Sequence, residues 1–463
     1  MAAPVIVPRA EHTLTRRDID PDALKVLYRL HDFNYAAYLV GGGVRDLLLG
    51  RRPKDFDVGT DAHPYQIKKL FRNCWIIGRR FRLAHVRFGN KAIEVATFRR
   101  NVVVEPAEWP EGEPGAGPAA ARREDAEASA AEGVRHDNTF GTAEEDAFRR
   151  DFTINALFYD IATFSIIDYV GGLEDLESGL IRSIGEPGQR FREDPVRMLR
   201  AVAMASRLEF RLDPPIVEAI REHRQLMALA APARLVEEFY KILRSAAAER
   251  TFRMLAAHGL LDPVTPELQR RATHEPLWQS LAALDAYRRR FAEMPPQLTN
   301  PILLGSLLLP LGLMPRAHAT DEPEEAVEDE ARPRARGWTS GRRDRRPKAP
   351  VLKIGMLPIA RRDSERLRQL LSVQGRLRDL ESSARTKRAL MNRGPFEDAL
   401  AWLDIHGQAS EIVEHWRGFI EAVGTEPAPP EASGSEPAAD ARRRRRRRGG
   451  RRRGRQAPPT GES

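Results

Sequence analysis

Three consecutive glycines constrain the fold of this chain most, because they separate a strand-like segment from a helix-like one. Residues 35–40 are apolar and rich in β-forming side chains, and residues 44–49 have the pattern of a short helix ended by Gly50. The sequence therefore predicts a strand, a turn over 41–43 and a helix. Glycine lets a backbone approach a ligand closely, and the free amides at a helix start favour an anion such as phosphate. Taken alone, such a turn is more often structural than functional.

Two carboxylates follow this turn and point to a chemical role for it. Asp55 and Asp57 lie two residues apart in a stretch with strand character, so alternation predicts that both point to one face. Adjacent carboxylates raise each other's pKa, and such a pair favours a bound cation. Glu94 lies among apolar residues of a second predicted strand, 92–98, where an acid is costly without a cation or a donor. We expect these oxygens to bind Mg2+, with Mn2+ as the alternative ion; two surface acids on an edge strand are the competing interpretation.

Five motifs extend this pattern along the chain in a fixed order. They are Gly-Gly-Gly-Val-Arg-Asp at 41–46 with Leu-Gly at 49–50, Asp-Phe-Asp at 55–57, Arg-Arg-Asp-Phe-Thr-Ile-Asn-Ala-Leu at 149–157, Asp-Tyr-Val-Gly-Gly at 168–172 and Glu-Asp-Pro-Val-Arg at 193–197. Together they resemble the class II branch of the polymerase β nucleotidyltransferase superfamily, which comprises tRNA CCA-adding enzymes and bacterial poly(A) polymerases. The resemblance covers residues 36–260. It implies an α+β fold, in which an N-terminal polymerase β-like mixed-sheet nucleotidyltransferase head precedes all-helical neck and body domains and a disordered basic tail.

The resemblance also implies roles for individual residues. The catalytic acids would be Asp55, Asp57 and Glu94, and the metals would be bound by Asp55 and Asp57. The nucleotide would be bound by Gly41, Gly42, Arg45, Arg150, Asp151, Asn155, Asp194 and Arg197. Within that set the glycines and Arg45 would hold the triphosphate, and Asp151 would recognise the ribose. In two-metal nucleotidyl transfer, one metal activates the attacking hydroxyl and the other holds the triphosphate and the leaving pyrophosphate.

Asp194 and Arg197 match the pair that reads the base edge in place of a template, and the sequence supports this pairing independently. Asp194 is a favoured N-cap and Pro195 a favoured first helical residue, so a helix is predicted to begin here. Residues 194 and 197 are then neighbours on the helix surface. An acid and an arginine together offer an acceptor and a donor to a base edge. A simple cap with an intrahelical ion pair is the alternative.

Shifts in composition predict the domain boundaries. We expect a nucleotidyltransferase head at 22–185 with a mobile insert at 105–133, a helical neck at 186–262, a helical body at 263–320, a charged linker at 321–350, a C-terminal helical domain at 351–423 and a disordered arginine-rich tail at 424–463. The insert is rich in Pro, Gly, Ala and Glu, and the linker joins an acidic block to a basic one. Apolar residues at helical spacing indicate that order returns after the linker.

Basic segments predict RNA as a binding partner. Arg79, Arg80 and Arg82 lie in a predicted turn within 76–88, a segment similar to the one that marks bacterial poly(A) polymerases; a basic surface turn is the alternative. Residues 442–455 carry eleven arginines and no acid, which is more than the net charge of +9 of the whole chain. Such a run binds phosphates by counterion release, and a solubilising tail is the other interpretation. The seven consecutive arginines are Arg442, Arg443, Arg444, Arg445, Arg446, Arg447 and Arg448.

These features predict a template-independent polynucleotide adenylyltransferase, which adds AMP from ATP to RNA 3′ ends in poly(A) tail synthesis. A tRNA CCA-adding nucleotidyltransferase is the alternative, because both activities use the same carboxylates, and a non-catalytic RNA-binding protein is the remote one. RNA-degradation or RNA-chaperone proteins are candidate partners besides RNA and ATP. One cysteine, Cys74, fits a reducing compartment, and the most apolar stretch, 302–314, is too short to span a bilayer. We therefore expect a cytoplasmic protein without membrane insertion.

Overall fold

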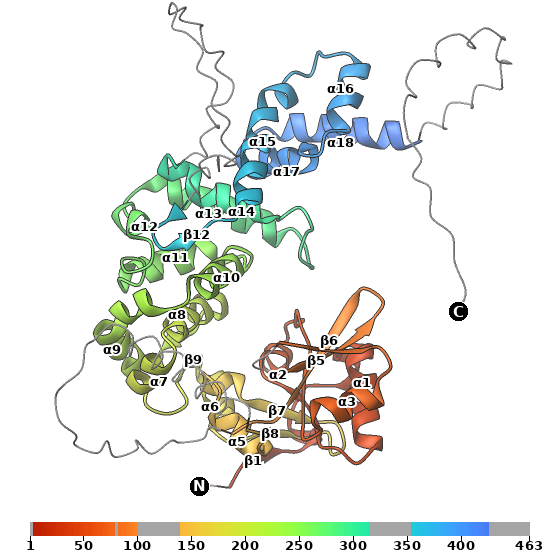
Figure 1. Ribbon diagram of the computed structural model, residues 1–463, viewed down its shortest axis with the longest axis vertical. Helices are drawn as coiled ribbons and strands as arrows, with labels where there is room; N and C mark the ends of the chain where they lie inside the picture. Colours follow the sequence, from red (N-terminus) through yellow and green to blue (C-terminus); the bar gives the residue numbers. More distant parts are fainter. Residues whose placement is uncertain (1–2, 79–81, 101–138, 314–352, 426–463) are drawn as a thin grey trace, which may run out of the picture. The chain divides into compact units, whose positions relative to one another are not determined.

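The computed structural model describes residues 3–78, 82–100, 139–313 and 353–425, and the chain divides into two units after Ile412 (Figure 1). The predictions made for the insert at 105–133, the linker at 321–350, Arg79, Arg80 and the tail from residue 426 lie outside the described residues. No helix in the described ranges is long and apolar enough to cross a membrane.

An eight-stranded mixed sheet forms the N-terminal part of the chain, as predicted. Its strand order is β1-β8-β7-β2-β3-β6-β5-β4. β3 and β6 run parallel, and every other neighbouring pair is antiparallel. The strands are β1 (Val5–Val7), β2 (Ala37–Val40), β3 (Asp57–Thr60), β4 (Cys74–Ile77), β5 (Leu83–Phe88), β6 (Lys91–Thr97), β7 (Leu157–Asp160) and β8 (Ile166–Asp168).

The two faces of this sheet are covered differently. On one face α1 (Pro21–Asp32) and α3 (Pro64–Leu70) pack against the strands (Figure 1), and Val58, Val86 and Val95 are fully buried there. On the other face α5 (Ala143–Phe148) covers the part formed by β2, β7 and β8, in a cluster that includes Val40 and Phe158. A short helix, α2 (Gly42–Leu48), follows β2 directly, so the predicted strand, glycine turn and helix are present.

The rest of the described chain is mostly helical, with two short ladders added. After α6 (Gly172–Ser178), β9 (Leu180–Ile181) pairs with β10 (Arg211–Leu212), and β11 (Lys353–Ile354) pairs with β12 (Leu357–Pro358). The helices are α7 (Pro187–Glu193), α8 (Val196–Leu208), α9 (Pro214–His223), α10 (Pro232–Leu243), α11 (Ala248–Ala257), α12 (Pro266–Arg270), α13 (Glu275–Arg289), α14 (Asn300–Leu308), α15 (Arg361–Arg378), α16 (Ala384–Met391), α17 (Phe396–His406) and α18 (Ser410–Thr425). The second unit begins at Val413, within α18.

The apolar helix α14 forms the centre of the later helices. All its residues from Pro301 to Leu308 are buried, and it packs against α13 and α15. The hydroxyl of Ser306 satisfies its hydrogen-bonding capacity inside this core, where its Oγ lies 2.8 Å from Nε2 of His406. The imidazole of His406 lies half-buried against the Trp402 ring, with ring centroids 4.1 Å apart.

We expect acid to destabilise this helical core through His406. Burial lowers the pKa of its imidazole to about 4, whereas an unfolded histidine titrates near 6.5. Between these values the unfolded chain binds a proton that the folded chain does not, so stability falls as the pH falls, by about 3 kcal/mol between pH 7 and pH 4. His406→Gln should flatten this dependence, measured as the urea midpoint between pH 7 and pH 4. An equally steep dependence in the variant would contradict the assignment.

Candidate active site

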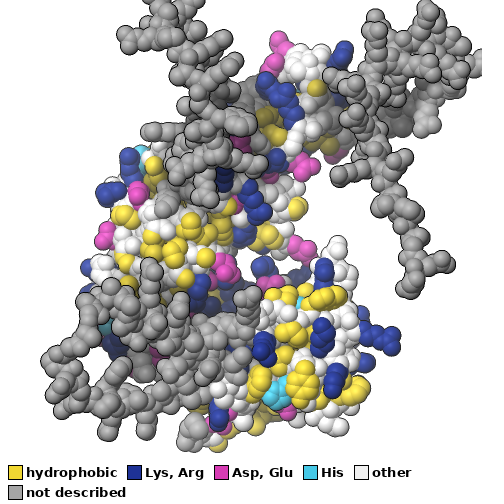
Figure 2. All heavy atoms as spheres, viewed as in Figure 1, with side chains coloured by type: hydrophobic (Ala, Val, Ile, Leu, Met, Phe, Trp, Pro, Cys, Tyr) yellow, Lys and Arg dark blue, Asp and Glu magenta, His cyan; other side chains and the backbone are white. Residues whose placement is uncertain are grey.

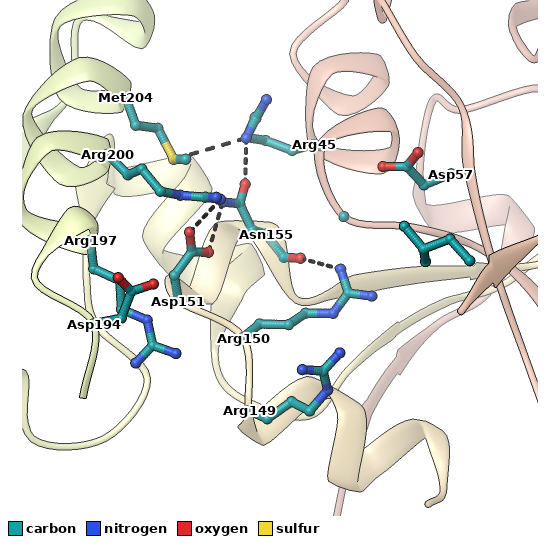
Figure 3. A pocket seen from close by; sticks show the side chains of 13 residues that line it. Arg45, Asp57, Arg149, Arg150, Asp151, Asn155, Asp194, Arg197, Arg200 and Met204 are labelled. Carbon is teal, nitrogen blue, oxygen red and sulfur yellow. Dashed lines mark hydrogen bonds and ion pairs between the residues drawn. The ribbon is translucent and has the colours of Figure 1, made fainter. Parts of the chain in front are cut away.

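A pocket of about 670 Å³ is formed between the sheet domain and the helix α8 (Figure 3). This volume is in the range of small-molecule sites. Five arginines and three aspartates line it, which gives the lining a positive excess suited to a polyphosphate. The pocket brings together nine residues predicted to bind nucleotide or metal: Gly41, Gly42, Arg45, Asp57, Arg150, Asp151, Asn155, Asp194 and Arg197.

The glycine turn lies at the end of β2 and is fixed by its backbone. The Gly41 amide donates to the carbonyl of Leu157 on β7 over 3.0 Å. Gly41 has φ +70 and ψ −131, a combination that only glycine adopts without strain. A Cβ at this position would lie 2.8 Å from Nη1 of Arg150 and 3.4 Å from the carbonyl oxygen of Asn155. The absence of a side chain therefore lets the turn and the Arg150 guanidinium approach each other.

Gly41→Ala should lower kcat/KM for the nucleotide about 10- to 100-fold. The substitution strains the backbone and displaces the Arg150 guanidinium, and 1.4 kcal/mol corresponds to a factor of ten. Gly50→Ala is the matched control, because Gly50 also has a positive φ of +65 but nothing lies within 4 Å of its added Cβ. Equal losses in the two variants, measured by steady-state kinetics, would show that the contact with Arg150 has no role.

Arg45 is buried and held from several sides. Its Nε donates to Oδ1 of Asp46 over 2.8 Å, and its Nη1 donates to Oδ1 of Asn155. The same Nη1 lies 3.9 Å from Sδ of Met204 on α8. These contacts fix the guanidinium at the pocket wall beside the glycine turn (Figure 3).

Arg150 is oriented by a buried acid that the sequence did not single out. Its Nε and Nη2 donate to Oδ2 of Asp146 over 3.1 and 2.9 Å, and its Nη1 donates to the carbonyl of Asn155 over 3.0 Å. Arg149 also donates to Asp146, over 2.9 Å, and lines the pocket. Arg190 of α7 donates to the carbonyls of Arg149 and Arg150, both over 2.6 Å. The helix α7 thus holds the segment that carries both arginines.

The prediction that Asp55 and Asp57 share a strand was wrong. β3 begins at Asp57, whose strand partner is Val40, the last residue of β2. Gly41 then turns the chain away, so β2 offers no partner to Asp55. Asp55 precedes the strand, exposed, and its Oδ2 lies 3.5 Å from Nζ of Lys54.

The negative charges of two other carboxylates nevertheless act on Asp57. Its pKa is raised to about 6, because burial disfavours its charge and because Glu94 and Asp55 repel it, while Arg150 acts in the opposite direction. Glu94, on the neighbouring strand β6, is exposed, and its Oε1 lies 3.5 Å from Nε2 of His85. Neither Asp55 nor Glu94 lines the pocket itself.

The chemistry of Asp55 and Asp57 fits a divalent cation. A cation would relieve the repulsion that raises the pKa of Asp57. Across the described ranges, no group of three His, Cys, Asp or Glu side chains is close enough together to hold a metal ion. Mg2+ is commonly bound by one or two carboxylates together with substrate phosphates, so a pair of aspartates is compatible with this ion.

Asp151 lies at the centre of a polar network between the sheet and α8. Its Oδ2 is 2.6 Å from Nη2 of Arg200, and its Oδ1 accepts from Nδ2 of Asn155 over 3.1 Å and from the amide of Phe152 over 2.9 Å. Burial alone would raise the pKa of Asp151. The charge of Arg200 and these hydrogen bonds outweigh burial and hold its pKa below the usual value. The carboxylate is therefore kept ionised and fixed in direction.

The expected helix start at Pro195 was one residue early. α8 begins at Val196, and Asp194 ends α7 instead of capping α8, although its Oδ1 still accepts from the Val196 amide over 3.3 Å. Pro195 takes the capping position, with helical φ and ψ and no side-chain cap of its own. Asp194 and Arg197 both line the pocket, but Arg197 donates to Glu193 over 3.1 Å.

Arg234 of α10 forms a two-pronged ion pair with Asp194. Its Nη1 and Nη2 lie 3.0 and 2.7 Å from the two carboxylate oxygens of Asp194. Both oxygens of this pocket residue are therefore already engaged, and the direction of its carboxylate is set by α10. Arg82, the one described arginine of the predicted basic turn, is exposed, has φ +40 and is not part of the pocket lining.

Three family models match this chain. Residues 37–182 match "Poly A polymerase head domain", residues 209–271 match "Probable RNA and SrmB- binding site of polymerase A", and residues 352–452 match "Polymerase A arginine-rich C-terminus". The first range includes every pocket residue from Gly41 to Asn155, whereas Asp194, Arg197 and Arg200 lie between the first and second ranges.

Curated relatives and a solved structure belong to the same two kinds of enzyme, poly(A) polymerases and CCA-adding enzymes. The chain is 49% identical over 268 residues to Poly(A) polymerase I of Salmonella typhi, an alignment that covers 58% of this chain and 55% of that protein. It is 35% identical over 242 residues to the CCA-adding enzyme of Lactobacillus johnsonii, covering 52% of this chain and 54% of that enzyme. The chain thus spans about half the length of the curated relatives it matches. The crystal structure of the Bacillus stearothermophilus CCA-adding enzyme in complex with CTP has the same fold, with a TM-score of 0.53 and 22% identity over 87% of this chain and 83% of that one.

Proposed function

Because the chain belongs to the family of poly(A) polymerases and CCA-adding enzymes, we propose that it is a polynucleotide adenylyltransferase that extends RNA 3′ ends from ATP. The observation that carries this proposal is the pocket, in which a glycine turn, Asp57, the Arg150–Asn155 segment and α8 meet around a space of nucleotide size. Poly(A) synthesis is favoured over CCA addition, since the identity is 49% to a poly(A) polymerase and 35% to a CCA-adding enzyme.

In the proposed reaction the protein binds ATP in three parts. The amides of the glycine turn and the guanidinium groups of Arg45 and Arg150 hold the triphosphate, because they form the positive wall of the pocket. Asp151, which Arg200 and Asn155 keep ionised and oriented, accepts a hydrogen bond from the ribose. Asp194 and Arg197 offer an acceptor and donors to the base edge.

Chemistry takes place at the α-phosphorus. The RNA 3′ oxygen attacks it, the bond to the oxygen that bridges the α- and β-phosphates breaks, pyrophosphate leaves, and the proton of the hydroxyl passes to solvent water. Asp55 and Asp57 would hold Mg2+, which when bound lowers the pKa of the hydroxyl and stabilises the leaving group. Glu94 adds negative charge beside Asp57 and so strengthens the attraction for cations. The protein itself mainly aligns the attacking oxygen with the phosphate.

RNA is the proposed macromolecular partner and the cytoplasm the proposed compartment. One of the matching family models, at residues 209–271, is described as an RNA- and SrmB-binding site, which supports both RNA and a protein partner there. RNA-degradation or RNA-chaperone proteins are the candidate class. The single cysteine, Cys74, is buried and has no thiol partner, as is common in reducing compartments.

The test is extension of an unstructured RNA by the full chain with Mg2+, with ATP and CTP supplied separately. A long product ladder with ATP alone is the expected result. Little extension of that RNA, together with addition of two or three nucleotides to a truncated tRNA, would identify a CCA-adding enzyme instead. RNA binding without any nucleotide addition would overturn both enzymatic assignments.

A further inference from the structure

Half of the sheet face that carries Asp57 is exposed. α5 and its cluster cover this face over β2, β7 and β8, whereas side chains on β4, β5 and β6 stand open on it. Trp75 and Ile77 of the edge strand β4 are 49% and 50% exposed, although their neighbour Cys74 is buried against the other face. Large apolar side chains at an exposed sheet edge are costly to keep soluble and often mark a binding surface.

The strand register connects this open surface to the proposed catalytic carboxylate. Val58 pairs with Val95, so Asp57 and Glu94 lie side by side one step earlier. Glu94 pairs with His85 on β5, and His85 pairs with Trp75 on β4. Paired residues point to the same face, so the four side chains form one row across four strands. Three strand spacings separate its ends, which is about 14 Å.

The far end of the row has the composition of a base-stacking site. The guanidinium of Arg87 on β5 lies 5.7 Å from the centre of the Trp75 ring, and the Arg87 side chain is exposed. Exposed aromatic rings beside cations bind single-stranded nucleic acids, because every base has a stacking face and each arginine can also reach a phosphate. Figure 2 shows basic and hydrophobic side chains intermingled on the visible face of the molecule.

We propose that Trp75 and Arg87 bind the single-stranded 3′ segment of an RNA, with one base stacked on Trp75 and a neighbouring phosphate on Arg87. The inference rests on the proposed function, because the row of side chains leads from this site to the carboxylate at which the RNA 3′ end would react. The ATP pocket also includes Asp57, together with Leu83 of β5, so the row of side chains and the pocket meet at this carboxylate. A base on Trp75 then holds the RNA behind its reacting end.

The test is the equilibrium affinity of the full chain for a labelled oligo(A), measured by fluorescence anisotropy at several salt concentrations without ATP. Trp75→Ala should raise Kd about tenfold, within the range for loss of one stacked base, and leave the salt slope unchanged. Trp75→Phe should retain most of the affinity. Arg87→Ala should weaken binding and reduce the salt slope by about one, as expected for one lost phosphate contact. In steady-state extension, Trp75→Ala should raise the KM for RNA and not that for ATP.

Phe33→Ala is the matched control. Phe33 is 52% exposed and has the Arg29 guanidinium 5.4 Å from its ring centre, but it lies at the end of α1 on the helical side of the sheet. The site would be overturned if Trp75→Ala bound RNA as tightly as the unsubstituted protein. It would also be overturned if Phe33→Ala lost as much RNA affinity as Trp75→Ala. A change of oligomeric state with parental RNA affinity would likewise overturn it and indicate a protein interface. A parent chain that binds oligo(A) through Trp75 but adds no AMP would overturn the proposed enzyme while leaving this RNA site intact.

Discussion

Asp57→Ala is expected to lower the rate of AMP addition at least about 10³-fold while the fold and the affinity for RNA are retained. Asp57 lines the pocket at the start of β3, and its pKa is raised by burial and, after that, by the charges of Glu94 and Asp55, which favour a cation. Loss of a ligand to the catalytic metals removes several kcal/mol of charge stabilisation in the transition state, and each 1.36 kcal/mol is a factor of ten. The measurement is single-turnover extension of a labelled RNA at saturating ATP and Mg2+.

Asp61→Ala provides the matched control for this experiment. Asp61 is an exposed acid directly after the other end of β3, and it is absent from the pocket lining. The Asp61→Ala variant should therefore extend RNA at close to the rate of the unsubstituted protein. If Asp57→Ala kept a tenth of the parental rate, the assignment of the metal site to this strand end would be wrong. Circular dichroism and oligo(A) binding of both variants separate loss of chemistry from loss of fold.

The parts of the site that depend on local sequence were predictable. Gly41, Asp57 and Asp151 belong to short motifs in which residue type and spacing already restrict the backbone, and all three line one pocket. The glycine turn after a strand is the clearest case. Its φ of +70 at Gly41 is a conformation that the glycine run itself suggests.

The boundaries of elements were less predictable, because they depend on partners far away in the chain. Asp55 has strand-forming neighbours, but β3 begins only at Asp57, opposite Val40, where β2 ends. Asp194 is a good capping residue by type. Its position at the end of α7 and its pair with Arg234 follow from the packing of three helices, which no local pattern encodes.

The contribution of α8 could be recognised only in the structure. Arg200, Met204 and Arg207 follow one another at helical spacing, and each contacts the sheet domain: Arg200 the carboxylate of Asp151, Met204 the guanidinium of Arg45, and Arg207 the carboxylate of Asp46, at 2.6, 3.9 and 3.8 Å. The spacing alone indicates one helix face. It does not indicate what that face touches, and here it touches the two groups proposed to hold the ribose and the triphosphate.

Arg200 is therefore a positioning residue, and Arg200→Ala should raise the KM for ATP about tenfold. The substitution leaves the largely buried Asp151 carboxylate without the guanidinium that pairs with it. We expect this to cost about 1–3 kcal/mol of binding free energy. This is less than for a fully buried ion pair, because Arg200 is 40% exposed. Arg200 also lowers the pKa of Asp151, so its removal should raise that pKa. If activity requires the ionised Asp151 carboxylate, the variant should lose activity on acidification at a higher pH than the unsubstituted protein does. The measurement is KM for ATP and kcat between pH 5 and pH 8.

Two further variants distinguish positioning from simple loss of stability. Arg200→Lys keeps the charge and should restore both the pH profile and part of the affinity for ATP. Asp151→Asn removes the charge that Arg200 neutralises, so the double variant Arg200→Ala/Asp151→Asn should be less affected than the sum of the single ones predicts. Additive effects, together with a pH profile of Arg200→Ala that matches the parent, would mean that Arg200 supports only the packing of α8. A coupled effect would instead mean that the helix following the sheet domain takes part in setting the nucleotide site, through one ion pair 2.6 Å long.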